Sequence, residues 1–131
     1  MEYAGREQRK SERLNAAFTL TYNVDVPVAL LIQSDLIGAM DALMLDLSAA
    51  GMAIITKHNL PKGAKIFIKF NIINLQLSGD DRRKHLEVAG EIVSNALRKD
   101  GGHRIGIRFD KISNADKQAI EDFVRSNKIS T

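Results

Sequence analysis

Apolar and polar residues alternate along several short segments of the chain, which is the pattern of half-buried β-strands. The clearest segment is 18–24, where every second residue is Phe, Leu, Tyr or Val and the residues between them are polar. The same reasoning predicts five more strands, at residues 42–46, 52–57, 66–77, 86–97 and 103–109. The chain is therefore expected to be mostly β.

A helical period replaces the alternation only near the C-terminus. Ile120, Phe123 and Val124 are spaced as the apolar stripe of a short helix that ends near Asn127. Ser113 is followed three residues later by an aspartate, which resembles a capping arrangement at the start of such a helix. Six strands followed by one helix suggest a small β-barrel with a helical lid.

Residues typical of turns separate the predicted strands. Residues 48–51 are small and suit a tight hairpin, while Pro61 and Gly63 suit a turn before the fourth strand. The charged residues 79–84 predict an exposed loop, and residues 100–102 close a hairpin between the last two strands. From the second predicted strand onward, the strands can therefore be joined by turns or short loops.

The segment 25–39 fits neither a strand nor a simple loop. It carries too many Val, Leu and Ile residues for a solvent-exposed connection, so we expect it to be buried against something. Either it packs inside the protein, or it forms a surface that a partner protein covers. The sequence leaves both possibilities open.

The composition excludes several classes of protein. The 131 residues are 44% hydrophobic and 27% charged, contain no cysteine and have a formal net charge of +3. We expect a cytoplasmic protein, because thiols are absent and no apolar run is long enough for a signal peptide or a membrane insertion. The slight charge excess and the lack of Trp argue against DNA or RNA as partner and against a small barrel that binds single-stranded nucleic acid.

No motif for catalysis or for metal binding is recognisable. His58, His85 and His103 lie in separate predicted loops or strand ends, without the spacing of metal ligands and without a nucleophile at a recognisable turn. No phosphate-cradling glycine loop is present. We therefore expect neither an enzyme nor a protein with a cofactor.

Two short motifs carry the functional information. The first is Arg-x-x-x-Arg at Arg9 and Arg13, and the second is Asp-x-Ser-x-x-Gly at Asp46, Ser48 and Gly51. Together, in this order on a strand-rich chain with a terminal helix, they resemble the two signatures of the PilZ family. The resemblance implies a six-stranded antiparallel PilZ-type β-barrel with a C-terminal α-helix over residues 14–131, preceded by a flexible N-terminal segment, 1–13.

The resemblance also implies a ligand, the bacterial second messenger cyclic di-GMP. Arg9 and Arg13 suit it because the planar guanidinium can donate two hydrogen bonds to a phosphate or to guanine O6 and N7. Asp46 can accept hydrogen bonds from guanine N1 and N2, and Ser48 lies on the same side of the strand. Leu47, between them, is expected to point into the barrel. Gly51 allows a tight turn or a close approach of the ligand to the backbone. The predicted ligand site consists of Arg9, Arg13, Asp46, Ser48 and Gly51.

Other positions bear on how the ligand is bound and on how far the site extends. Many family members have a second arginine where this chain has Gln8, so one cyclic di-GMP or a stacked pair remains possible. Arg104, Gly106 and Arg108 share the side of the sixth strand opposite its apolar residues. We interpret them as a solvent-facing strand side rather than as ligand contacts.

Three kinds of function are compatible with a small barrel of this kind. The first is a receptor that converts the cyclic di-GMP level into a conformational change read by a downstream protein partner. The second is a PilZ-like module that binds only proteins and ignores nucleotide, although such members usually lose motif residues. The third, a binder of single-stranded nucleic acid, is the poorest fit to the charge and the aromatic content.

We predict that cyclic di-GMP orders the segment 1–13, because it is polar, charged and precedes the first strand. Amide hydrogen exchange of residues 5–14 should slow when the ligand is added. Equal exchange in both states would contradict this prediction.

Overall fold

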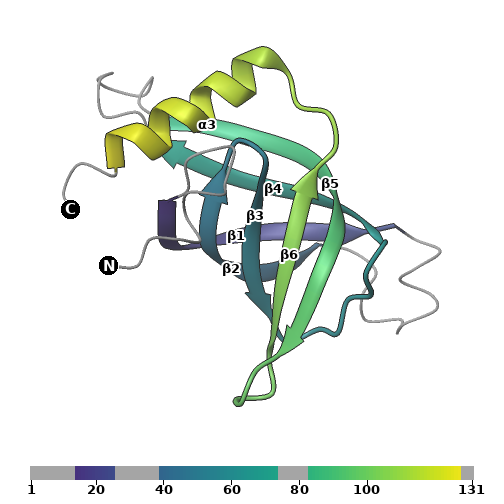
Figure 1. The fold of residues 1–131 in the computed structure, drawn as a ribbon. Coiled ribbons are helices and arrows are strands. Elements are labelled where there is room, and N and C mark those ends of the chain that lie inside the picture. Colours follow the sequence, from purple (N-terminus) through teal and green to yellow (C-terminus); the bar gives the residue numbers. More distant parts are fainter. Residues whose placement is uncertain (1–13, 26–38, 74–82, 128–131) are drawn as a thin grey trace, which may run out of the picture.

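Six antiparallel strands and one helix make up the part of the chain that the computed structural model describes, which is residues 14–25, 39–73 and 83–127. The elements are β1 (Leu14–Val24), β2 (Met40–Ser48), β3 (Gly51–Thr56), β4 (Lys65–Ile73), β5 (Arg83–Leu97), β6 (His103–Phe109) and α3 (Asn114–Asn127). The strands follow each other in the order β1-β2-β3-β6-β5-β4, and β4 pairs with β1 to close a barrel (Figure 1). The predicted six-stranded antiparallel barrel with a C-terminal helix is confirmed.

Several strands are longer than their apolar pattern indicates. β1 begins four residues before the predicted start, and β2 continues past Asp46 to Ser48. Arg83 and Lys84 were expected in a loop but pair with Ile73 and Ile72 of β4. Backbone pairing does not depend on an apolar side chain, so a charged residue can extend a strand whose partner is in place. Residues 26–38 and 74–82, which include most of the apolar segment 25–39, lie outside the described residues.

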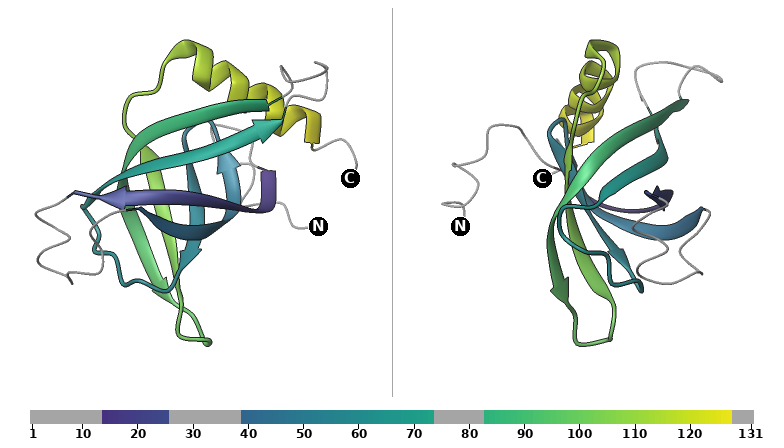
Figure 2. Two further views of the ribbon diagram at one scale, coloured as in Figure 1. Left: turned by 180° about the vertical axis from the view of Figure 1, so that it is seen from behind. Right: turned by 90° about the vertical axis from the view of Figure 1, so that its right-hand side faces the viewer.

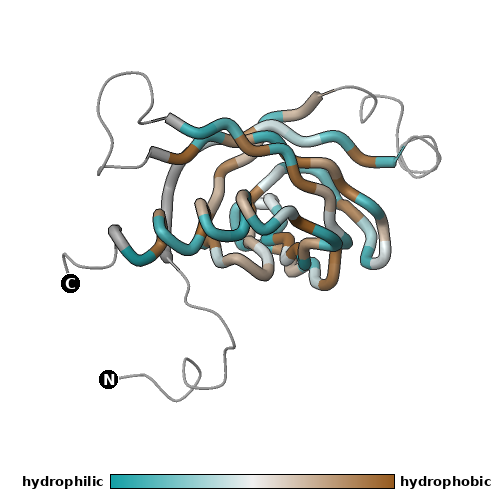
Figure 3. The backbone as a smooth tube through the Cα atoms, turned by 90° about the horizontal axis from the view of Figure 1, so that it is seen from above, coloured by the Kyte–Doolittle hydropathy of each residue, from teal (hydrophilic) through white to brown (hydrophobic). Residues whose placement is uncertain are grey.

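The barrel is filled by the apolar residues that alternate along its strands. Figure 3 shows hydrophobic and hydrophilic residues alternating along the chain, as expected when each strand has one side in the core. The side chains that are buried most completely are Tyr22, Met44, Leu47, Met52, Ile54, Leu60, Ile66, Ile68, Leu86, Ile92 and Ile105. This continuous core holds the barrel wall, and with it any site on the outer face, in one arrangement.

The helix α3 lies across one end of the barrel (Figures 1 and 2). Ile120 and Val124 are buried in the core, and the helix contacts β2 and β4. The backbone N–H of Asp116 donates to the hydroxyl of Ser113 at 3.1 Å, so Ser113 is the N-cap that the sequence predicts. The described residues contain no helix that is long and apolar enough to cross a membrane.

The β5–β6 hairpin projects beyond the opposite end of the barrel (Figures 1 and 2). Its tip is closed by a 2.8 Å hydrogen bond from the N–H of Arg98 to the carbonyl of Gly102, with Gly101 at a φ of 92°. The N–H of Gly102 also donates to the carboxylate of Asp100 at 2.9 Å, and this bond holds the pKa of Asp100 below its usual value. The predicted turn at residues 100–102 is confirmed.

One buried polar pair makes the core sensitive to alkaline pH. The hydroxyls of Tyr22 and Thr56 are 2.7 Å apart inside the barrel. Burial raises the pKa of Tyr22 above its ordinary value of 10.0, an effect that the hydrogen bond with Thr56 partly offsets. The folded barrel therefore keeps this phenol neutral at a pH where the unfolded chain ionises it.

We expect the free energy of unfolding to be unaffected by Tyr22 below pH 10, and to fall as the pH rises above it. The unfolded chain then loses a proton that the folded protein keeps, so the slope is at most about 1.4 kcal/mol per pH unit. Urea unfolding of the wild type and of Tyr22→Phe at pH 9 and pH 11 measures this effect. Only the wild type has this buried phenol, so equal losses in the two proteins would contradict the prediction.

Candidate functional site

The second motif forms one corner of the barrel, where β2 turns into β3. Asp46 and Ser48 are among the last residues of β2, and Gly51 is the first residue of β3 and pairs with Ser48. The three predicted site residues of this motif are therefore brought together in a single hairpin. Arg9 and Arg13, the other two, lie outside the described residues.

A β-bulge sets the direction of Asp46. Met44 pairs with Ile54 and Asp46 pairs with Ala53, so β2 has one more residue than β3 at this point. With regular alternation Asp46 would share the inward side of Met44, but the extra residue reverses the phase. Leu47 then lies in the core, as predicted, and the carboxylate lies on the outer face of the barrel, the side turned away from the core.

Asp46 is nearly buried although it lies on the outer face. Its side chain is 8% exposed, and its Oδ2 atom lies 3.4 Å from Nη2 of Arg104, a β6 side chain that is 45% exposed. The sequence predicts Arg104 on the solvent-facing side of its strand, and its exposed side chain agrees with this; the structure adds that the guanidinium lies beside Asp46. Alternation placed Arg104 on the correct side of its strand, but only the pairing of β2, β3 and β6 brings it to Asp46.

Small residues surround this ion pair on the outer face. Asp46 is in register with Ala53 of β3, which pairs with Gly106 of β6, which in turn pairs with Ser94 of β5. A Cβ atom on Gly106 would overlap the hydroxyl of Ser94. The residues in register with Asp46 across this part of the barrel wall are therefore small.

Ser48 takes part in the turn itself. Its hydroxyl accepts a hydrogen bond from the N–H of Ala50 at 3.2 Å and lies 3.4 Å from the carbonyl oxygen of Gly51. The side chain is 1% exposed. These contacts are those of a serine that stabilises a tight turn, so Ser48 has a structural role that needs no ligand.

The neighbouring strand β6 leaves no room for a side chain at position 51. A Cβ atom at this position would overlap the carbonyl oxygen of Ile107, which is backbone of β6 and has no freedom to move aside. The close approach predicted from the motif is present, but in this structure it is made by β6 rather than by a ligand.

A shallow pocket borders the same corner. It has a volume of about 320 Å³ and is lined by Ala49, Ala50, Arg108, Phe109, Asp110, Ile112 and Lys117. Two of these residues belong to the β2–β3 turn, and two carry a positive charge. Arg108 is paired with Glu91 at 3.0 Å, whereas Lys117 comes from the first turns of α3. The corner that carries the second motif therefore continues into a hollow with cationic side chains.

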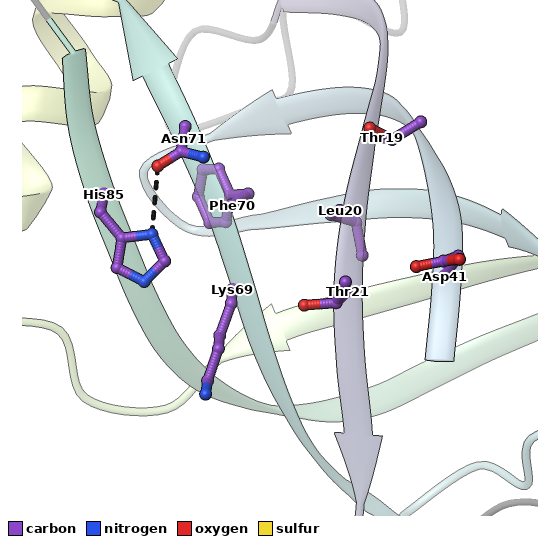
Figure 4. Close-up of a pocket in the computed structure, with 8 residues that line it drawn as sticks. All are labelled: Thr19, Leu20, Thr21, Asp41, Lys69, Phe70, Asn71 and His85. Carbon is purple, nitrogen blue, oxygen red and sulfur yellow. Dashed lines mark hydrogen bonds between the residues drawn. The ribbon is translucent and has the colours of Figure 1, made fainter. Parts of the chain in front are cut away.

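Another pocket, of about 270 Å³, lies on the outer face near β1 and β4, and it includes Asp41 of β2 (Figure 4). Most of its polar side chains are uncharged, and Nδ1 of His85 lies 3.1 Å from Oδ1 of Asn71. It contains none of the predicted site residues. We assign no ligand to this pocket.

Two of the three histidines have local side-chain hydrogen-bond partners. Nε2 of His85 lies 3.0 Å from the carboxylate of Glu87, and Nδ1 of His103 lies 2.9 Å from the amide oxygen of Asn95. Within residues 14–25, 39–73 and 83–127, no group of three or more His, Cys, Asp or Glu residues is arranged to hold a metal ion. These contacts are typical of surface histidines.

Several solved structures have the same fold. The inhibitor of motility from Bacillus subtilis superposes with a TM-score of 0.71 at 12% identity, covering 95% of this chain and 53% of that one. The PilZ domain of YcgR from Escherichia coli, solved with cyclic di-GMP, gives a TM-score of 0.58 at 15% identity, covering 94% and 93%. The MrkH complex with cyclic di-GMP from Klebsiella pneumoniae gives 0.62 at 11%, covering 94% and 52%.

These likenesses establish the fold, and the chain spans only about half the length of the inhibitor of motility. Comparison with curated protein sequences finds no significant match. The family model of the PilZ domain, however, matches residues 7–126, which include both motifs, all six strands and α3 except for Asn127. The chain therefore belongs to the PilZ domain family.

Proposed function

We propose that this protein is a receptor for cyclic di-GMP, catalyses no reaction, and passes the level of the messenger to a partner protein through a conformational change. The observation that carries the proposal is the complete pair of motifs in a PilZ chain, with Asp46 held on the outer face of the barrel beside an arginine. The shared fold alone is weaker support for a receptor function than the motifs, because one fold can support many functions.

The chemistry of the ligand fits the residues that the motifs supply. Cyclic di-GMP carries two phosphodiester anions and two guanine bases. Arg9 and Arg13 supply guanidinium groups that can each donate two hydrogen bonds to a phosphate or to the O6 and N7 edge of a base. Asp46 supplies the acceptor for guanine N1 and N2. We propose Arg9, Arg13 and Asp46 as direct contacts, with Ser48 and Gly51 shaping the turn that presents Asp46.

The solved relatives support this choice of ligand. The PilZ domain of YcgR and the MrkH protein were both solved with cyclic di-GMP bound. Since they share the barrel and this chain has both motifs, the same messenger is the simplest ligand to propose. The partner protein and the process it controls are not identified by these likenesses.

Calorimetric titration of the protein with cyclic di-GMP tests the proposal directly. We expect saturable heat and a rise in melting temperature with ligand concentration, because a ligand that binds only the folded state stabilises it. The stoichiometry decides between one ligand and a stacked pair, which the residue Gln8 leaves open. If cyclic di-GMP produced neither heat of binding nor a rise in melting temperature, the receptor proposal would be wrong.

That negative result would favour the second function, a PilZ module that recognises only proteins. One observation is compatible with it, since the hydroxyl of Ser48 and the position of Gly51 are both explained by the barrel alone. A motif retained for turn geometry does not require a ligand. Titration is therefore needed to separate the two functions.

Asp46→Ala is expected to weaken cyclic di-GMP about tenfold and also to lower stability by about 1 to 2 kcal/mol. The substitution removes the acceptor for the base and leaves Arg104 without the carboxylate at 3.4 Å. Titration and urea unfolding measure the two effects separately. Asp41→Ala is the control, because Asp41 lies on the same strand but is exposed and is not part of the motif. Equal losses in the two variants would contradict a specific role for Asp46.

A further inference from the structure

Arg104 reaches Asp46 across an intervening strand. It lies on β6, Asp46 lies on β2, and β3 runs between them (Figure 1). On β3, Ala53 pairs with Asp46 and Ile55 pairs with Arg104, so the Arg104 side chain runs diagonally across β3 to reach Asp46. The result is a donor and an acceptor side by side, presented on the outer face by two strands that are not neighbours.

The contact between the two side chains is loose. The Nη2–Oδ2 distance of 3.4 Å is longer than the roughly 2.7 to 2.9 Å of a tight charge-assisted hydrogen bond. Arg104 is 45% exposed, and among the described residues Asp46 is its one hydrogen-bond partner. Arg108, on the same side of β6, is instead bound to Glu91 at 3.0 Å. Most of the Arg104 donors are therefore free to bind a ligand.

An acceptor next to a donor matches the Watson–Crick edge of guanine. That edge presents the N1–H and N2–H donors beside the O6 acceptor, so a carboxylate and a guanidinium can bind it together. Adenine presents the reverse order, with an N6–H donor where guanine has O6 and an N1 acceptor where guanine has N1–H. Adenine would set donor against donor at Arg104 and acceptor against acceptor at Asp46.

We infer that Arg104 donates to O6 of a guanine whose N1 and N2 bind Asp46, and that this pair makes the site selective for cyclic di-GMP over cyclic di-AMP. The inference rests on the proposed receptor function and adds a specificity-determining residue from β6 to the residues of the two motifs. Selectivity follows because a site built from fixed polar groups leaves them unpaired when the wrong base binds.

Titration of the wild type, Arg104→Ala, Arg104→Lys and Arg108→Ala with cyclic di-GMP and cyclic di-AMP tests the inference. Wild type should prefer cyclic di-GMP by about a hundredfold or more. Arg104→Ala should weaken cyclic di-GMP about tenfold without weakening cyclic di-AMP, so that the preference contracts by the same factor. Arg104→Lys, which keeps one charged donor, should lose less. Arg108→Ala should keep the preference within about twofold, since its guanidinium is already bound to Glu91.

A second measurement separates direct contact from an effect through Asp46. If Arg104 binds the base itself, Arg104→Ala should still weaken cyclic di-GMP in an Asp46→Ala background. If Arg104 only orients Asp46, the double variant should bind no more weakly than Asp46→Ala alone. The inference is overturned if the double variant shows no further loss of affinity, or if Arg104→Ala keeps the wild-type preference for cyclic di-GMP. In either case, binding of cyclic di-GMP by the wild type still supports the receptor function. Absence of cyclic di-GMP binding by the wild type would reject both.

Discussion

Arg9→Ala and Arg13→Ala are each expected to weaken cyclic di-GMP at least about tenfold and to leave the melting temperature of the ligand-free protein almost unchanged. Each substitution removes one or two hydrogen bonds to a charged group, worth about 1.5 to 3 kcal/mol apiece. Both arginines precede β1 in the sequence, so we expect the barrel core to form without them. Calorimetric titration and thermal unfolding of each variant measure the two quantities.

Lys10→Ala is the matched control, because Lys10 lies between the two arginines and carries the same charge. If only net charge attracted the dianionic ligand, all three substitutions would cost the same. A lysine lacks the planar fork that binds phosphate or guanine with two parallel hydrogen bonds, so we expect a small loss at this position. Similar losses in all three variants, or no loss at Arg9 and Arg13, would show that the assignment of these arginines is wrong.

Gly51→Ala should destabilise the protein by about 2 to 4 kcal/mol, a large share of the roughly 5 to 15 kcal/mol that stabilises a domain of this kind. The new methyl group would overlap the carbonyl oxygen of Ile107, so β3 and β6 would have to separate locally. Urea unfolding measures the loss. Once corrected for the folded fraction, the affinity for cyclic di-GMP should change little, because the constraint comes from β6.

Gly102→Ala is the comparison for this effect. A Cβ atom at Gly102 would meet its nearest neighbours at 3.3 and 3.4 Å, which small adjustments can relieve. We expect a loss below about 1 kcal/mol. If Gly51→Ala proved as mild as Gly102→Ala, the packing explanation for the motif glycine would be wrong. If it abolished binding in a stable protein, Gly51 would instead approach the ligand.

The barrel itself could be predicted from the sequence, because its strands and its helix each follow a simple period. Alternation located part of every strand, and the change of period after Phe109 located α3 together with its cap at Ser113. The ends of strands were less predictable. Arg83 and Lys84 extend β5 since their partners in β4 are present, which the apolar pattern of β5 alone does not reveal.

Part of the candidate site was also readable in the sequence. The spacing of Asp46, Ser48 and Gly51 indicated one hairpin, and the position of Leu47 in the core was expected. Local spacing is sufficient here because a hairpin joins residues that are adjacent in the chain.

Tertiary structure decided the rest, because the other features depend on which strands become neighbours. Alternation from Met40 through Met44 would turn Asp46 inward, and only the bulge opposite β3 turns it outward. Arg104 is 58 residues from Asp46 in the chain and meets it because β3 pairs with both β2 and β6. Gly51 is constrained by the backbone of β6 for the same reason. The sequence alone determined the repeat of apolar residues that sets each strand and the helix. Contacts between strands that are distant in the sequence arise only when the barrel closes.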